Sequence, residues 1–189
     1  ATAGNDHRLG GNEAPPAIIS VYLGDELEGV LEAIRNGVWT VEKVKAVMET
    51  GVESLPTFKK DTTDRNRTSP FAFTGNKFEF RMVGSSDSIA SANTTLHAVV
   101  AEAFCDAADI LEKSDDFDRD VKKLIAEYMT KHQRILFKGN GYSEEWVKEA
   151  EHRGLPNMKT MVDAIPALNT PKAVALFEKF HVFTRAELE

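Results

Sequence analysis

The stretch KFEFR, residues 77 to 81, places three ionisable side chains at alternate positions of a predicted β-strand. Side chains on a strand alternate between its two faces, so Lys77, Glu79 and Arg81 share one face, and Phe78 and Phe80 share the other, which we expect in the core. A carboxylate between two cations suits a metal–phosphate site, in which the glutamate binds the cation and the basic groups meet phosphate oxygens. The alternative is a solvent-exposed strand face with an ion pair, which composition alone favours.

Two loops carry further polar groups that could take part in chemistry. NDHRLGGNEAPP, residues 5 to 16, holds Arg8 and Glu13 around a pair of glycines, and NRTS, residues 66 to 69, holds Arg67. Taken singly, each of these side chains is more often a solvated surface group. The histidines lack the spacing of metal ligands, so no motif of this chain is decisive by itself.

Composition argues against several classes of function. The chain has 189 residues, a net charge of -7 and a pI of about 5.3, without the clustered basic face that a nucleic-acid or anionic-membrane surface needs. Cys105, the only cysteine, excludes disulfides within the chain and indicates a buried, inert thiol in a reducing compartment. The sequence shows neither a membrane-span pattern nor a signal peptide. We therefore expect a cytoplasmic location and, because the chain opens without Met directly in a loop, a piece of a longer protein.

The elements that position these groups are predicted from periodicity. Residues 16–24 form a short β-rich run, and residues 25–60 read as a helical hairpin, whose first helix runs from a cap at Asp25 to a stop at Gly37. Its second helix is predicted from Thr40 to Gly51, with apolar residues at helical spacing. Residues 71–83 predict an antiparallel β-hairpin that turns at Gly75-Asn76.

A long helix is predicted from about residue 88 to 112, and the rest of the chain reads as helix after helix. The long helix has a wide apolar stripe, typical of packing against a core: Leu96, Val99, Val100, Ala103, Phe104, Ala107, Ile110 and Leu111. Later helices are signalled by caps at Ser143, at Thr170-Pro171 and at Thr184 with Glu187. The sequence thus predicts an α+β fold, with a mixed region over residues 1–113 and a helical region over 114–189.

The two loops and the hairpin occur in one order: an arginine, a glycine-rich turn ending in NEAPP, then NRTS, then a strand ending in EFR. This order resembles the C-terminal half of the glutamine synthetase catalytic domain. NDHRLGGNEAPPAI and NRTSPFAFTGNKFEFR are most similar to the long bacterial type III branch. The resemblance covers nearly the whole chain. It implies that residues 1–113 contain short antiparallel strands of the catalytic sheet, with the hairpin of residues 25–60 as an insertion, and that residues 114–189 are a helical extension.

The resemblance implies roles for residues that match the family's motifs. Arg8 corresponds to the arginine that holds the substrate glutamate. Glu13 corresponds to the flap glutamate that closes over the site and receives the ammonium ion. Arg67 corresponds to the arginine that meets phosphate and the γ-carboxylate, and Arg81 to the arginine that neutralises the transferring phosphoryl group and the glutamate.

Two further assignments concern the metal and the nucleotide. Glu79 corresponds to a carboxylate ligand of the metal that lies between the nucleotide phosphates. Lys77 stands at a phosphate-binding position where the family usually has arginine, so it keeps the charge but loses the planar fork. The stretch PFAF and Thr74 also stand where the family commonly has basic residues. These departures imply that nucleotide contacts are built differently in this branch.

The reaction implied is the ATP-dependent joining of glutamate and ammonia into glutamine through a γ-glutamyl phosphate, with Mg²⁺ or Mn²⁺ as cofactor. The family resemblance also implies further metal ligands upstream and neighbouring subunits in homo-oligomeric rings. The isolated chain is therefore expected to be inactive. The alternative is a non-catalytic helical assembly or regulatory module, and the sequence upstream of Ala1 would distinguish the two.

Overall fold

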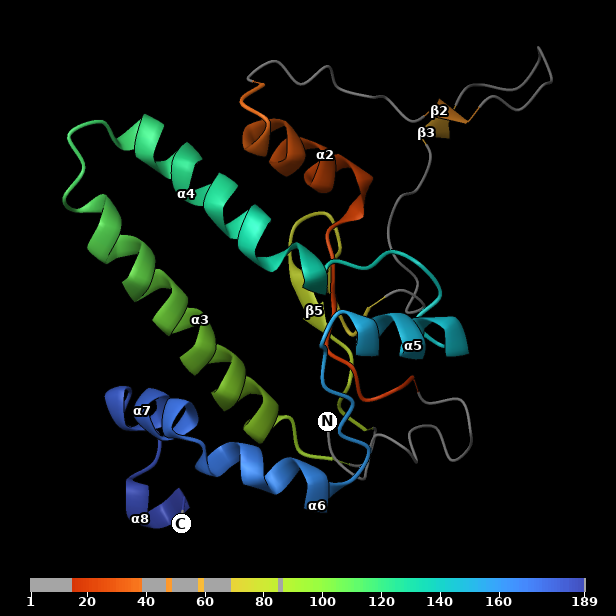
Figure 1. Ribbon diagram of the computed structural model, residues 1–189, viewed down its shortest axis with the longest axis vertical. Helices are drawn as coiled ribbons and strands as arrows, with labels where there is room; N and C mark the ends of the chain where they lie inside the picture. The colour runs from red at the N-terminus through yellow and green to blue at the C-terminus, as the bar shows by residue number, and fades with distance from the viewer. Residues whose placement is uncertain (1–14, 39–46, 49–57, 60–68, 85–86, 189) are drawn as a thin grey trace.

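The computed structural model describes residues 15–38, 47–48, 58–59, 69–84 and 87–188 (Figure 1). A small β-sheet and a set of helices make up this part of the chain, so the predicted α+β class is confirmed. In the view of Figure 1, strand β5 lies between the pair of long helices α3 and α4 and the shorter helix α5. Within the described ranges no helix combines the length and the apolar character needed to cross a membrane. The bounds are α3 Ala90–Leu111, α4 Phe117–His132 and α5 Glu144–His152.

The sheet has three short strands in the order β1-β4-β5. β4 and β5 pair antiparallel, as predicted, whereas β1 runs parallel to β4, with Val21 opposite Phe71. The expectation of antiparallel strands is therefore corrected at β1. Parallel neighbours need a long crossover, and the chain between β1 and β4 is long enough to supply it. The strand bounds are β1 Val21–Tyr22, β4 Phe71–Phe73 and β5 Phe78–Phe80.

The β4–β5 hairpin turns at Gly75-Asn76, as the sequence predicted. The amide of Thr74 donates a hydrogen bond to the carbonyl of Lys77 at 2.8 Å, which closes the two-residue turn. Gly75 has φ +95°, a backbone conformation that residues with a Cβ rarely adopt. Because a two-residue turn sets the register of both strands, this glycine decides which side chains share the face of Lys77.

Helix α2 (Gly24–Arg35) confirms the first helix of the predicted helical hairpin. It stops where predicted, at Gly37, whose φ is +71°. The N-cap is Leu23 rather than Asp25, and Asp25 lies in the first turn. A carboxylate there still stabilises the helix through the helix dipole. α2 packs mainly against α4.

The prediction of a second helix in that hairpin is wrong for the residues that the structure describes. Val47–Met48 is strand β2, which pairs antiparallel with β3 at Phe58–Lys59. The spacing that predicted a helix was carried by valines, and β-branched side chains favour extended backbone once a partner strand is present. The other residues of the predicted helix lie outside the described part of the chain.

From residue 114 onward the described chain is helical apart from connecting segments and one bridge between Leu136 and Val21. The predicted caps are confirmed. The hydroxyls of Ser143 and Thr170 each accept a hydrogen bond from the amide three residues further on, and the amide of Thr184 donates to the Glu187 carboxylate at 2.8 Å. The remaining bounds are η2 Gln133–Ile135, α6 Met161–Ala164, η3 Ile165–Asn169, α7 Pro171–Lys179 and α8 Arg185–Leu188.

The main buried cluster joins α5 to the segment before β1. Ile18, Trp146, Ala150 and Leu155 are buried together. The ring of Phe137 packs against this cluster by stacking on the ring of Trp146, with the two centroids 3.7 Å apart. The helical region and the sheet region therefore share a core, although the sequence pattern separates them near residue 113.

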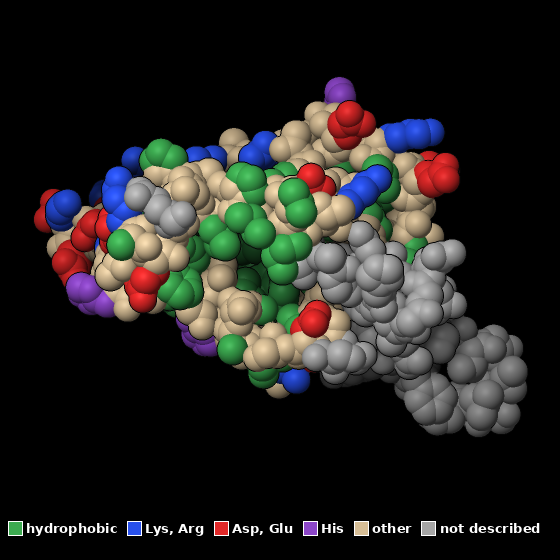
Figure 2. Space-filling view, turned by 90° about the horizontal axis from the view of Figure 1, so that it is seen from below, with side chains coloured by type: hydrophobic (Ala, Val, Ile, Leu, Met, Phe, Trp, Pro, Cys, Tyr) green, Lys and Arg blue, Asp and Glu red, His purple; other side chains and the backbone are tan. Residues whose placement is uncertain are grey.

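Helix α3 forms as predicted, but its apolar stripe is not core. Ala98 is the only buried residue of this helix, and Phe104 is 70% exposed. Cys105 is half-buried rather than buried. Large apolar side chains are also exposed elsewhere, as at Val162 in α6, and Figure 2 shows hydrophobic side chains gathered around a hollow in the face seen from below. Periodicity identified the apolar side of α3 but could not say what covers it.

Candidate functional site

Lys77, Glu79 and Arg81 converge on one face of the hairpin, as the alternation predicted. Arg81 donates to Oε2 of Glu79 from Nε at 3.2 Å and from Nη2 at 3.1 Å. Nζ of Lys77 lies 3.3 Å from Oε1 of the same carboxylate. Each oxygen of Glu79 thus has its own cationic partner. Among the described side chains of this ionic face, two cations thus flank one carboxylate.

The three side chains differ in how far they are withdrawn from water. The Arg81 side chain is 12% exposed, that of Glu79 39% and that of Lys77 65%. The amide of Arg81 also donates to the carbonyl of Pro70 at 2.7 Å, which extends the hairpin pairing beyond β5. Arg81 is therefore a permanently charged group fixed at both its backbone and its side chain. Lys77 faces solvent at the turn end of the same face.

The ionic contacts also lower the pKa of the Glu79 carboxyl group. Hydrogen bonding from Arg81, and next from Lys77, holds the pKa of Glu79 below its ordinary value of 4.5. Both cations favour the charged form of the carboxyl group. Glu79 is therefore an anion at neutral pH and can act as an oxygen donor without first losing a proton.

The aromatic face of the hairpin differs from the prediction. Phe78 is 44% exposed, and its ring stacks on that of Phe71 with the centroids 5.1 Å apart. Two residues of the hairpin are buried: Ala72, which lies directly opposite Glu79 and so shares its face, and Met82. The expectation that Phe78 and Phe80 lie in the core is corrected for Phe78. Alternation tells which side chains share a face, but it does not tell which face the rest of the protein covers.

A buried pair of serines beside the hairpin was missed by the sequence analysis. The hydroxyl of Ser69 donates to the carbonyl of Phe137 at 3.0 Å, and it accepts from the hydroxyl of Ser20. The carbonyl of Ser20 in turn accepts from the amide of Phe71 in β4. A serine inside the apolar run AIISVYL was the available signal, because a buried hydroxyl needs a partner.

The fit of these residues to a metal is partial. Glu79 offers the hard oxygen donor that Mg²⁺ or Mn²⁺ prefers, but divalent cations of this kind take about six oxygen ligands. Within the described ranges no group of three or more His, Cys, Asp or Glu side chains lies together. Glu79 can therefore be one ligand of a metal centre, and the described residues by themselves do not complete one.

The remaining predicted site residues are Arg8, Glu13 and Arg67, and all three lie outside the described part of the chain. Their roles stay predictions. The described site is thus the ionic face of the hairpin.

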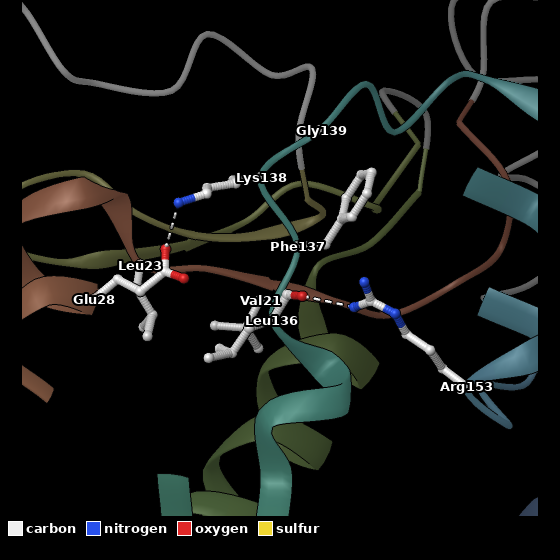
Figure 3. Close-up of a pocket in the computed structure, with 8 residues that line it drawn as sticks. All are labelled: Val21, Leu23, Glu28, Leu136, Phe137, Lys138, Gly139 and Arg153. Atoms are coloured by element: carbon white, nitrogen blue, oxygen red, sulfur yellow. Dashed lines mark hydrogen bonds and ion pairs between the residues drawn. The ribbon is translucent and has the colours of Figure 1, made fainter. Parts of the chain in front are cut away.

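A separate hollow of about 350 Å³ lies between β1, the start of α2 and the segment before α5 (Figure 3). Figure 3 shows Arg153 reaching to the backbone of Leu136, to whose carbonyl it donates at 2.8 Å, while Lys138 points towards Glu28 at 3.5 Å. Both cations of this hollow are thus committed to partners within the chain.

Comparison with known proteins identifies the family. The family model of the glutamine synthetase C-terminal domain matches residues 120–189. A glutamine synthetase of Butyrivibrio fibrisolvens is 45% identical over 191 residues, which are 100% of this chain and 27% of that protein. The chain therefore belongs to the glutamine synthetase family. A type-3 glutamine synthetase of Dictyostelium discoideum is 43% identical, over 100% of this chain and 26% of that protein, which agrees with the predicted branch.

A third relative, a glutamine synthetase of Bacteroides fragilis, is 41% identical over 99% of this chain and 27% of its own length. The chain thus spans about a quarter of the length of the relatives it matches. About three quarters of the length of each relative therefore lies outside the match.

Proposed function

We propose that this chain is part of an ATP-dependent glutamate–ammonia ligase that forms glutamine through a γ-glutamyl phosphate, and that it is inactive by itself. The observation that supports this best is the ionic face of the β4–β5 hairpin. There the residues of a family motif meet, with Glu79 held between Arg81 and Lys77. Two cations that flank a carboxylate on one strand suit a site that receives phosphoryl and carboxylate groups together with a metal ion.

Arg81 is the group best prepared to stabilise a charge that develops during reaction. Its side chain is nearly buried, and its backbone is tied to Pro70. A cation that is already in place needs no reorganisation when the γ-phosphoryl group of ATP moves to the γ-carboxylate of glutamate, releasing ADP. In this proposal Arg81 neutralises the transferring phosphoryl group and also contacts the glutamate.

Lys77 and Glu79 both act on the nucleotide in this proposal, one through its phosphates and the other through the metal ion. Lys77, the more exposed cation, meets phosphate oxygens as a point charge. Glu79 is one ligand of the Mg²⁺ or Mn²⁺ ion, which when bound reduces the negative charge on the phosphates. The other ligands come from sequence that this chain does not contain.

In this proposal the two loops bind the substrate glutamate and phosphate and carry the group that handles ammonia. Arg8 holds the substrate glutamate, and Arg67 meets phosphate and the γ-carboxylate. Glu13 attracts the ammonium ion and accepts a proton from it. The resulting ammonia attacks the acyl phosphate carbon, the C–O bond to phosphate breaks, and inorganic phosphate leaves. A closed flap would also exclude the water that hydrolyses acyl phosphates.

Assembly and location complete the proposal. The parent protein would form homo-oligomeric rings in the cytoplasm, in which a neighbouring subunit completes each site. Two relatives named glutamine synthetase and one named type-3 glutamine synthetase support the reaction class. The family model that matches residues 120–189 supports the assignment of this stretch to the C-terminal part of such a protein.

A graft tests the proposed function. The chain replaces the matching stretch of the Butyrivibrio relative, and glutamine formed and ATP consumed are measured for the chimera and for the isolated chain. We expect the chimera to make glutamine and the isolated chain to make none. Arg81→Met should abolish activity in the chimera, whereas Arg119→Met, which removes an arginine paired with Asp120 on α4, should not. An active Arg81→Met chimera, or an isolated chain that makes glutamine, would refute the proposal.

A further inference from the structure

One side of helix α3 is apolar and exposed along most of its length. The side consists of the residues that share one stripe of the helix, here called the α3 face: Leu96, Val99, Val100, Ala103, Phe104, Ala107, Ile110 and Leu111. Val99 is 49% exposed, Phe104 70% and Ile110 49%. Soluble proteins rarely leave a continuous apolar stripe of this length open to water, so the α3 face indicates a contact surface.

The other side of α3 already has a partner within the chain. Lys179 of α7 forms an ion pair with Glu102 at 2.5 Å, and α7 packs on α3 around it. Ala98, the buried residue of α3, lies on this covered side of the helix. The described residues therefore cover one side of the helix and leave the more apolar side open.

The α3 face continues into a groove at the C-terminal end of the helix. Phe104, Ala107 and Leu111 line it together with Phe117 from the start of α4, and its volume is about 410 Å³. Phe117 is itself 61% exposed. Two aromatic rings and several small side chains around a groove can receive apolar side chains from a partner.

We infer that the α3 face docks against the remainder of a glutamine synthetase polypeptide, as an interface within one chain. The inference rests on the proposed function. Its specific support is length: the relatives match this chain over only 26 to 27% of their own sequence, so most of the polypeptide that could cover the face lies outside the matched stretch.

A second copy of this chain is the competing occupant. It is less favoured because one helical stripe flanked by a shallow groove is small for a stable dimer, whereas the missing three quarters of the relatives can enclose the whole helix. Among the described residues of the isolated chain the face is open, and we expect the complete polypeptide to cover it.

Cysteine accessibility tests this statement without any need for activity. In a Cys105→Ser background, Phe104→Cys places a thiol on the α3 face, and Asp109→Cys places one on a polar, exposed part of the same helix as a matched control. Both variants are treated with N-ethylmaleimide, alone and in the Butyrivibrio chimera, and labelling of the α3 peptide is followed by mass spectrometry. We expect Phe104→Cys to react at least tenfold more slowly in the chimera, and Asp109→Cys to react equally in both.

Equal labelling of Phe104→Cys in the isolated chain and in the chimera would overturn the inference. Protection already present in the isolated chain, together with a dimer by light scattering, would also overturn it in favour of a second copy. A chimera that protects the cysteine but makes no glutamine would refute only the proposed function. A chimera that makes glutamine with the cysteine open would refute only this inference.

A second variant tests the inference by thermal stability, compared between the isolated chain and the chimera. Phe104→Glu should leave the thermal unfolding midpoint of the isolated chain nearly unchanged, because the ring already contacts water there. The same change should make the chimera insoluble or lower its midpoint clearly. A clear loss of stability in the isolated chain would mean that the face is buried within it, and the inference would fall.

Discussion

The hydroxyl of Ser20 donates a hydrogen bond to the hydroxyl of Ser69 at 2.9 Å, and both side chains are buried. Because Ser69 donates onward to the carbonyl of Phe137, three segments far apart in the sequence meet at this one point. Ser69 is followed by Pro70, whose carbonyl holds the backbone of Arg81. The position of the ionic hairpin thus depends on a contact with the helical region that contains no charged group.

Removing the shared hydroxyl should destabilise the chain. Ser69→Ala leaves the Ser20 hydroxyl without its acceptor and the Phe137 carbonyl without its donor, and an unsatisfied buried polar group costs about 1–3 kcal/mol. Thr130→Ala is the matched control, because it also removes one hydroxyl bonded to a carbonyl, but at an exposed position on α4. Urea unfolding should show a clear loss for the first variant and little change for the second. Equal losses would contradict the buried relay.

Replacing either of two glycines by alanine should change the free energy of unfolding, with opposite signs at the two positions. A Cβ at Gly139 would lie 2.7 Å from the ring of Phe137, which stacks on Trp146 and has little freedom to move away. Gly139→Ala should therefore cost about 1–3 kcal/mol, the usual penalty of overpacking. Gly29 lies inside α2 with open space around it. Gly29→Ala should stabilise the chain by about 0.5–1 kcal/mol through helix propensity. Thermal unfolding of both variants gives the sign of each effect.

The ionic hairpin should give the chain a dependence on acid pH. The pKa of Glu79 is lower in the folded chain than its ordinary 4.5, because of hydrogen bonding from Arg81 first and Lys77 second. The stabilisation by Glu79 is therefore fully present above pH 4.5 and is lost as the pH falls through the lowered pKa. NMR titration of the carboxyl carbon should show the pKa rising in Arg81→Met more than in Lys77→Met. A larger rise in Lys77→Met would reverse the assigned order of causes.

The two basic residues of the hairpin should differ in their tolerance of exchange. In the active chimera, Arg81→Lys loses the pair of donors that hold Oε2 of Glu79, so glutamine formation should fall about a hundredfold to a thousandfold, the range for a lost preorganised donor. Lys77→Arg keeps the charge at an exposed position and should change the rate little. Steady-state rates at saturating substrates decide this, and equal losses would mean that the two cations have equivalent roles.

The flap assignment is tested by Glu13→Gln in the same chimera. The substitution keeps the size of the side chain but removes its capacity to accept a proton. The ammonia step should slow by about a hundredfold to ten-thousandfold, the range for a positioned acid–base group. ATP hydrolysis without amide formation should rise in proportion, because water is no longer excluded. Glutamine formed per ATP consumed, at saturating ammonium, is the measurement. An unchanged ratio with an unchanged rate would make Glu13 an ordinary loop carboxylate.

The sequence by itself determined the features that depend on neighbours along the chain. Gly75 specifies the hairpin turn because few other residues accept its φ, and Thr170 specifies a helix start because its hydroxyl reaches an amide three residues away. The alternation of KFEFR likewise placed Lys77, Glu79 and Arg81 on one face. These interactions span a few residues, so a local pattern carries all the information they need.

The tertiary structure decided everything that depends on a partner distant in the sequence. Val47 joins a strand because Lys59 lies opposite it, and within the hairpin Ala72 is buried whereas Phe78 is 44% exposed. The link between Ser20 and Ser69 spans 49 positions and has no local pattern. Apolar residues that repeat at helical or strand spacing indicate that a surface must be covered, but only the packed chain shows what covers it. The α3 face is the remaining case, because the described part of this chain does not contain its cover.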